Sequence, residues 1–269
     1  MFDLTRLLHA RSPRPAVDFN AMLNWKLLRG SHDFPGPDGG TCINEAAIVS
    51  AGYPYRSVQS IDDCPSSFSR PMSLFAMCLN DALDDELRQE LLMRFVTRLA
   101  GSADTRPVEL ERAQTLMARI ATDILAPALA QAGLQELSDR CRSITTPQDL
   151  FYLAHAIRGE ARLNSGVHLL LISACDHAAD AAEQWNSSRP TEIVLSASRV
   201  VGEVAAAVSD HVPPSHRDRA TADVYRQAAA ILDDALKIGK QSAMTSDEMA
   251  VLRLEDAKHA AAKREQAAA

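Results

Sequence analysis

The sequence has few aromatic residues, few glycines and prolines, and no closely spaced cysteine pair. Aromatic residues make up 5% of the 269 residues, and there are 11 Gly and 13 Pro. The five cysteines are an odd number without a C-x-x-C pair, which argues against a disulfide framework and favours a reducing compartment. No segment offers about 18 consecutive apolar residues, and the first fifteen residues lack the apolar core of a secretory signal. We therefore expect a cytoplasmic protein without a membrane span.

Acidic residues outnumber basic ones, 35 to 28. The formal net charge is −7 at pH 7, and no run of five or more Lys or Arg is present. Because an acidic protein repels phosphate backbones, nucleic-acid binding is disfavoured. A small basic face made of Arg94, Arg98, Arg106 and Arg112 is the one feature that keeps a helical nucleic-acid-binding regulator open as a weaker alternative. The common nucleotide-binding, hydrolase and zinc-protease motifs are missing, so that no cofactor or metal is expected.

The pattern that remains is helical. Apolar residues recur at a spacing of three and four over most of the chain, and alanine is abundant. This periodicity predicts an all-α, multi-helix bundle of eight to eleven helices, with one irregular, loop-rich excursion near residues 30–70. Within the excursion, residues 55–58 are a candidate short strand, and Pro127 is expected to kink or end a helix. The expected helices span 18–29, 42–51, 71–82, 84–100, 106–132, 134–143, 147–158, 162–185, 190–211, 215–239 and 245–269.

The same pattern suggests how the chain is divided. Residues 1–16 are expected to form a flexible arm, and residues 17–186 the main helical domain. The segment "NSSRP" at 186–190 is the candidate boundary before a helical hairpin over 190–240. A terminal helix over 245–269 ends in a frayed, alanine-rich tail. The C-terminal helices are the expected surface if the protein forms an oligomer.

Several unusual stretches follow one another between Trp25 and Arg112. They are "HDFPGPDGGTCINEAAIVSAG", "YRSV", "DDCPSSFSRP", "LNDAL" and "RFVTRLAGSADT". In this order and with these gaps, they resemble a family of uncharacterised bacterial and bacteriophage proteins. The resemblance covers about a third of the chain. It implies a phage or mobile-element origin but no activity, ligand or catalytic residue.

Cys42 is the strongest candidate for a catalytic residue. It follows Gly39, Gly40 and Thr41, and Thr41 is predicted to cap a helix that begins at Cys42. A thiol at a helix N-terminus can have a lowered pKa, as in thiol enzymes. His32 is the nearest candidate base, and His155 and His168 are more distant options. The alternative is that Cys42 is a small apolar residue packed under the start of the helix.

Two polar residues follow on the first turn of the same helix. Glu45 is favoured there by the helix dipole, and Asn44 can reach back towards the Thr41 N–H group, as in an imperfect capping box. Both are therefore predicted structural caps. In an alternative interpretation, Glu45 pairs with Arg56 or Arg70 and fixes the neighbouring loop.

The excursion also concentrates side chains of the kinds that dominate protein contacts. Tyr53, Tyr55, Arg56, Asp62 and Asp63 lie within a dozen residues, in a chain that has four tyrosines. These five are the predicted partner-binding residues, and a loop packed on its own side chains is the alternative. The residues expected to hold this layer on the bundle are Ile43, Ala47, Ile48, Val58, Ile61 and Phe68.

Histidine and acidic residues gather once more, in "HLLLISACDHAAD". His177 and Asp180 lie one helical turn apart, but no facing Glu-x-x-His pair completes a metal site. A surface role for His177, or a pair with Asp180, is expected instead. We therefore interpret the sequence as a non-enzymatic cytoplasmic binding or scaffold protein that recognises another protein. A thiol-dependent hydrolase or transferase that uses Cys42 is the alternative.

Overall fold

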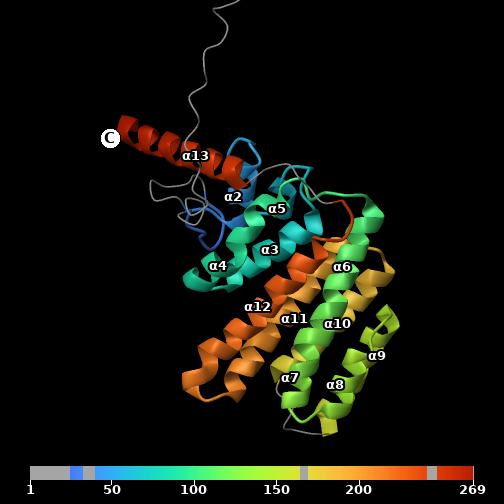
Figure 1. Ribbon diagram of the computed structural model, residues 1–269. Coiled ribbons are helices and arrows are strands. Elements are labelled where there is room, and N and C mark those ends of the chain that lie inside the picture. Colours follow the sequence, from blue (N-terminus) through green and yellow to red (C-terminus); the bar gives the residue numbers. More distant parts are fainter. Residues whose placement is uncertain (1–24, 33–39, 164–168, 241–246, 269) are drawn as a thin grey trace, which may run out of the picture.

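The computed structural model describes residues 25–32, 40–163, 169–240 and 247–268, and helices dominate this part of the chain (Figure 1). The predicted all-α fold is confirmed, since the described residues contain no β-strand beyond an isolated parallel bridge between Leu27 and Thr41. None of the helices in these ranges has both the length and the apolar character needed to cross a membrane. The helices are α2 (Ile43–Ser50), α3 (Arg70–Ala82), α4 (Asp85–Leu92), α5 (Val96–Leu99), α6 (Arg106–Ile120), α7 (Ala126–Gln131), α8 (Gln135–Arg142), α9 (Pro147–Leu163), α10 (Leu169–Asn186), α11 (Pro190–His211), α12 (Arg217–Ala235) and α13 (Asp247–Ala268).

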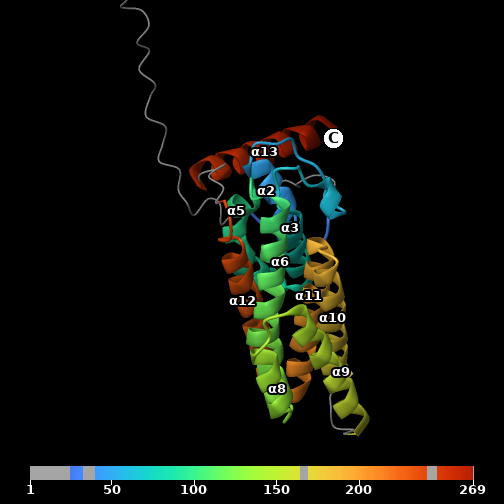
Figure 2. The ribbon, with the colours of Figure 1, turned by 90° about the vertical axis from the view of Figure 1, so that its right-hand side faces the viewer.

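Helix α11 forms the centre of the molecule. It packs against α10, α12, α6 and α3, and the long helices run side by side along the body in both views (Figures 1 and 2). Its buried face consists largely of small and β-branched residues, which let neighbouring helices approach closely. Helices α2 to α5 lie at one end of this bundle, and α13 crosses that end over α2. The buried residues of α11 include Ile193, Val194, Ala197, Val200, Val201 and Val204.

Helices on both sides of residues 186–190 share one buried core. The predicted division into a main domain and a C-terminal hairpin stays a prediction, and the predicted arm over 1–16 lies outside the described residues. The terminal helix begins close to its predicted position. Its first half is anchored on α2, where Val251 and Leu254 are buried and the Arg253 guanidinium donates to the Ser50 carbonyl oxygen at 2.7 Å.

The irregularity predicted at Pro127 takes the form of a π-turn. Residues Ala121–Leu125 form this turn between α6 and α7, because proline lacks an N–H group and its ring crowds the carbonyl of the preceding turn. Helix α8 satisfies the carbonyl groups at the two ends of the turn. The Ser138 hydroxyl donates to the Ala126 oxygen at 2.7 Å, and the Cys141 thiol donates to the Ala121 oxygen at 2.9 Å.

The predicted helix over 84–100 is not continuous. Helix α4 ends at Leu92, a 3₁₀ turn spans Met93–Phe95, and α5 follows. Leu92, Met93, Phe95 and Val96 are all buried. This spacing of i, i+1, i+3 and i+4 also fits one broad face of a continuous α-helix, so that the apolar pattern predicts the burial but not the 3₁₀ turn.

The predicted helix over 18–29 is wrong in its described part, because residues 25–29 are not helical and Leu27 instead forms an isolated parallel bridge with Thr41. Side chains of α3 and α4 bind the backbone of this segment in place of a neighbouring strand. The Gln89 amide oxygen accepts from the Leu27 N–H group at 3.0 Å and its amide nitrogen donates to the Trp25 carbonyl at 2.8 Å. Asn80 donates to the Leu28 carbonyl at 2.9 Å, and the buried Arg88 reaches the Leu27 carbonyl. These bonds outweigh the local helical pattern, since a buried backbone group needs a partner.

Residues 53–69 form an irregular layer beside α2. The candidate strand over 55–58 does not form, and this stretch is extended chain without a β-partner. The residues predicted to hold the layer on the bundle are buried as expected, apart from Ile61, which is partly buried and packs against the core. The buried ones are Ile43, Ala47, Ile48, Val58 and Phe68.

Replacing Ile48 by Ala should lower the free energy of unfolding by about 2–4 kcal/mol, because the side chain is fully buried and its removal leaves a cavity. Denaturant unfolding followed by circular dichroism measures this loss. Leu169→Ala is the matched control. Leu169 is 79% exposed, so that this change should cost about 0.5 kcal/mol or less. Equal losses in the two variants would contradict the placement of Ile48 in the core.

Candidate functional site

The N-terminus of α2 is capped by Cys42 and not by Thr41. The Cys42 sulfur accepts from the Glu45 N–H group at 3.5 Å, and the Glu45 carboxylate accepts from the Cys42 N–H group at 2.9 Å. This is a capping box with cysteine in the place of serine or threonine. Thr41 instead accepts from the Trp25 indole N–H group at 2.9 Å. The prediction that Thr41 is the cap was wrong by one residue, and the C-x-x-E spacing is the signal that could have placed it.

Cys42 lacks the properties of an activated nucleophile. The residue is buried, and burial, together with the nearby Glu45 carboxylate, raises the pKa of its thiol well above the usual value. The lowered pKa expected at a helix N-terminus is therefore wrong, because desolvation outweighs the helix dipole. His32, the predicted base, hydrogen bonds to Glu45. The His155 ring nitrogen Nδ1 donates to the Phe151 carbonyl oxygen at 3.1 Å, and His168 lies outside the described residues.

Glu45 connects three segments of the irregular region through hydrogen bonds. Its carboxylate is fully buried and accepts backbone N–H groups from three segments: Cys42 at 2.9 Å, His32 at 3.0 Å and Val58 at 3.0 Å. The Ser31 hydroxyl donates to the same carboxylate at 3.1 Å, and the His32 ring lies 3.4 Å from it. A carboxylate can be buried at tolerable cost only when several donors surround it.

Two further predictions for the first turn of α2, an ion pair of Glu45 and a capping role of Asn44, are not met. Glu45 does not pair with Arg56 or Arg70 in the structure, because both arginines donate to carbonyl groups of the layer, Arg56 to Asp63 and Arg70 to Ile61. Asn44 is not a cap. Its side-chain amide nitrogen donates to the Ser73 carbonyl of α3 at 3.0 Å, which ties α2 to α3.

The five predicted partner-binding residues differ in their exposure and in the hydrogen bonds that their side chains form. The Tyr55 hydroxyl donates to the His32 carbonyl at 2.7 Å, and the Asp63 carboxylate accepts from the N–H groups of Ser60 and Gln59, which lower its pKa. Tyr55 and Asp63 therefore help to hold the layer, as in the alternative of a self-packed loop. Tyr53, Arg56 and Asp62 are exposed.

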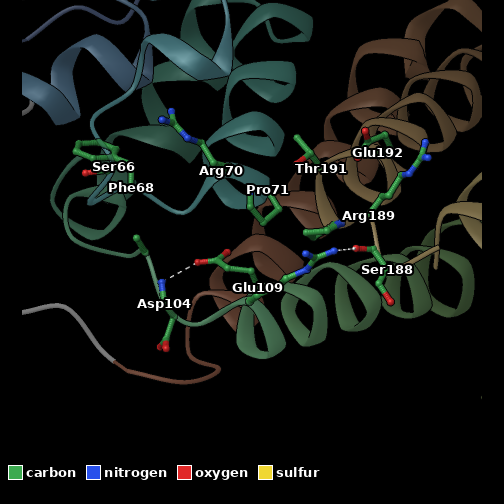
Figure 3. Close-up of a pocket in the computed structure, with 13 residues that line it drawn as sticks. Ser66, Phe68, Arg70, Pro71, Asp104, Glu109, Ser188, Arg189, Thr191 and Glu192 are labelled. Atoms are coloured by element: carbon green, nitrogen blue, oxygen red, sulfur yellow. Dashed lines mark hydrogen bonds between the residues drawn. The ribbon is translucent and has the colours of Figure 1, made fainter. Parts of the chain in front are cut away.

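A cleft of about 540 Å³ opens where the irregular layer meets the bundle (Figure 3). Three segments line it: residues 66–71 at the start of α3, residues 103–109 at the start of α6 and residues 188–192 at the start of α11. Phe68, Pro71, Ala103 and Pro190 give it an apolar part, and the other lining residues are polar or charged. This volume lies within the range of pockets that hold small molecules.

Two acidic residues of the cleft are already bound. The Asp104 carboxylate accepts from the N–H groups of Lys240 and Thr105, which lower its pKa, and Glu109 accepts from the Ser69 hydroxyl and the Asp104 N–H group. Glu109 also pairs with the buried Arg112 at 3.2 Å. These carboxylates organise the wall of the cleft, and their charge is largely compensated.

The remaining candidates do not form a second site. The four arginines of the expected basic face do not form one exposed, uncompensated cluster, since Arg112 is buried and Arg98 pairs with Asp233. His177 lies 3.6 Å from Asp180, as expected. Within the described ranges, no group of three or more His, Cys, Asp or Glu is arranged to hold a metal ion.

Comparison with protein-family models, with curated proteins and with solved structures finds no match for this chain. The resemblance to a bacterial and bacteriophage family therefore depends on the short stretches between Trp25 and Arg112 alone. Any functional interpretation has to start from the irregular layer and the cleft.

Iodoacetamide labelling near neutral pH tests the state of the Cys42 thiol. Only the thiolate reacts, and burial disfavours the thiolate, so that Cys42 in the folded protein should react more slowly than N-acetylcysteine from about pH 7 to 9. It should become reactive when the protein is unfolded in denaturant. Peptide mass spectrometry assigns the label among the five cysteines. Rapid, selective labelling of Cys42 in the folded protein would contradict this account and restore the thiol-enzyme alternative.

Proposed function

We propose that this chain is a non-enzymatic binding protein that recognises another protein through the exposed face of its irregular layer. The observation that supports this most is the rigid support of that face. The Glu45 carboxylate accepts hydrogen bonds from the backbone N–H groups of His32 and Val58, while Tyr53, Arg56 and Asp62 remain exposed. A surface that is ordered before binding loses less conformational entropy on association, and tyrosine and arginine are enriched at energetically dominant contacts.

The competing functions have less support. A thiol-dependent enzyme needs an accessible thiolate with a base nearby, whereas Cys42 is buried and His32 contacts Glu45. A nucleic-acid-binding regulator needs a basic face, and the candidate arginines are dispersed. The five cysteines are free, which is consistent with the proposed cytoplasmic location. A phage or mobile-element origin and oligomerisation through the C-terminal helices remain parts of the same proposal.

Site-specific photocrosslinking in the native host tests the proposal. A photoreactive phenylalanine analogue at Tyr53 should give one discrete crosslinked protein, because the side chain is exposed on the proposed face. The same analogue at Tyr152, an exposed tyrosine of α9, is the matched control and should not capture that protein. The purified partner should then bind the purified chain, and Arg56→Ala with Asp62→Ala should weaken binding about tenfold or more without changing the thermal midpoint.

Two results would contradict the proposal. The first is the capture of the same proteins from Tyr53 and from Tyr152, which would indicate nonspecific contact. The second is a purified partner whose affinity is unchanged by the Arg56 and Asp62 substitutions, which would place the recognition surface elsewhere.

A further inference from the structure

Three short sequences of the same type meet at the cleft. Each consists of a hydroxyl residue, an arginine and a proline: Ser69-Arg70-Pro71, Thr105-Arg106-Pro107 and Ser188-Arg189-Pro190. They are far apart in the sequence, yet they begin α3, α6 and α11, and each contributes to the lining of the same cleft (Figure 3). Proline suits the first turn of a helix, because the N–H group it lacks would have no partner there. The recurrence therefore brings three helix N-termini and three arginines to one cavity.

The arginines at the cleft differ in what they already bind. Arg70 donates to the Ile61 carbonyl and so belongs to the layer. Arg106 is exposed, and its bond within the described residues is a long one of 3.4 Å to the Ser188 carbonyl. The Arg189 side chain is exposed, and its guanidinium group has no hydrogen bond or ion pair with any other described residue, although its backbone N–H group donates to the Gln184 carbonyl. Two guanidinium groups at the rim are thus free to bind a ligand at little cost in existing bonds.

The backbone beneath these two arginines adds donors of the same kind. Neither Thr105 before α6 nor Arg189 before α11 makes a side-chain cap bond to a described N–H group, so that the first N–H groups of both helices lack the partner that a cap would supply. The N-terminus of a helix carries a partial positive charge. By contrast, Ser69 caps α3 at the Met72 N–H group. The first turns of α6 and α11 each carry one carboxylate, Glu109 and Glu192, so that the attraction for an anion comes from the arginines and the uncapped N–H groups and not from a lack of acidic residues.

The state of the carboxylates in the cleft determines whether the cleft favours a negatively or a positively charged ligand. Asp104 and Glu109 are compensated by the N–H, hydroxyl and guanidinium groups described above. Glu192 on the first turn of α11 is exposed and has no ion pair within the described residues. Among the described residues, the charged side chains of the cleft that lack an ion pair are three positive ones, Arg70, Arg106 and Arg189, and two negative ones, Asp104 and Glu192, before the two helix N-termini are added.

We propose that this cleft binds a phosphate group, held between Arg106 and Arg189 at the starts of α6 and α11. Arginine forms paired hydrogen bonds with phosphate oxygens, and free N–H groups at a helix N-terminus are suited to the same anion. The apolar surface of Phe68 and Pro71 then contacts the organic part of the phosphate ester. The inference does not depend on the proposed protein recognition, because the cleft and the exposed face of the layer are formed by different side chains.

Calorimetric titration of the full chain with O-phosphoserine and with inorganic phosphate at low salt tests the proposal. Both should bind saturably at one site. The double variant Arg106→Gln with Arg189→Gln should weaken binding about tenfold or more, since each arginine supplies charge-assisted bonds. Glu192→Gln should strengthen it, because the substitution removes the free negative charge. Circular dichroism checks that each variant remains folded.

Arg217→Gln is the matched control. Arg217 is an exposed arginine at the first position of α12, away from the cleft, and its helix also lacks a side-chain cap. Its removal should change the affinity for phosphoserine less than twofold. The proposal is overturned if neither probe binds saturably, if the double variant binds as well as the wild type, or if Arg217→Gln weakens binding as much as the double variant. The last result would mean that phosphate responds only to the overall charge.

Discussion

A single buried carboxylate fixes the irregular part of this molecule. Glu45 is fully buried, and its oxygens accept hydrogen bonds from the backbone before α2, at the start of α2 and after α2. An unpaired charge in such a position would be strongly destabilising, so that the surrounding segments are stable only in the arrangement that brings their donors to it. One side chain thus determines where residues 31–32 and 58 lie relative to the helix.

Long polar side chains elsewhere extend the same principle. Asn80, Arg88 and Gln89 bind the non-helical segment over 25–29, and Arg112 binds the carbonyl groups of Ser102 and Ile238. The end of the bundle is therefore covered by irregular chain whose backbone groups are satisfied by side chains, without a sheet. The side chains that remain exposed are therefore attached to an ordered backbone. The starts of α3, α6 and α11 line one cleft.

The helices could be predicted from the sequence because apolar periodicity reports burial directly, as in α11 and α12, whose predicted and observed bounds agree closely. The non-helical segment at Trp25 could not, since its partners are Asn80, Arg88 and Gln89, more than fifty residues away. Local pattern also could not reveal that desolvation would raise the pKa of Cys42. The cleft could not be predicted for a similar reason. The Ser/Thr-Arg-Pro sequences around Arg106 and Arg189 are far apart in the chain, and only the packing of the helices brings them to one cavity.

Amide hydrogen exchange in the nearly isosteric variant Glu45→Gln tests the central claim most directly. Glutamine keeps the size of the side chain but has one acceptor oxygen, so that it cannot accept both from Cys42, which uses one carboxylate oxygen, and from His32 and Val58, which use the other. A hydrogen bond to a charged group is worth about 1.5–3 kcal/mol. The account predicts that the amides on at least one side, Cys42 or His32 with Val58, exchange about ten to a hundred times faster than in the wild type, while those in the middle of α11 are unchanged. Unchanged protection at all three amides would contradict it.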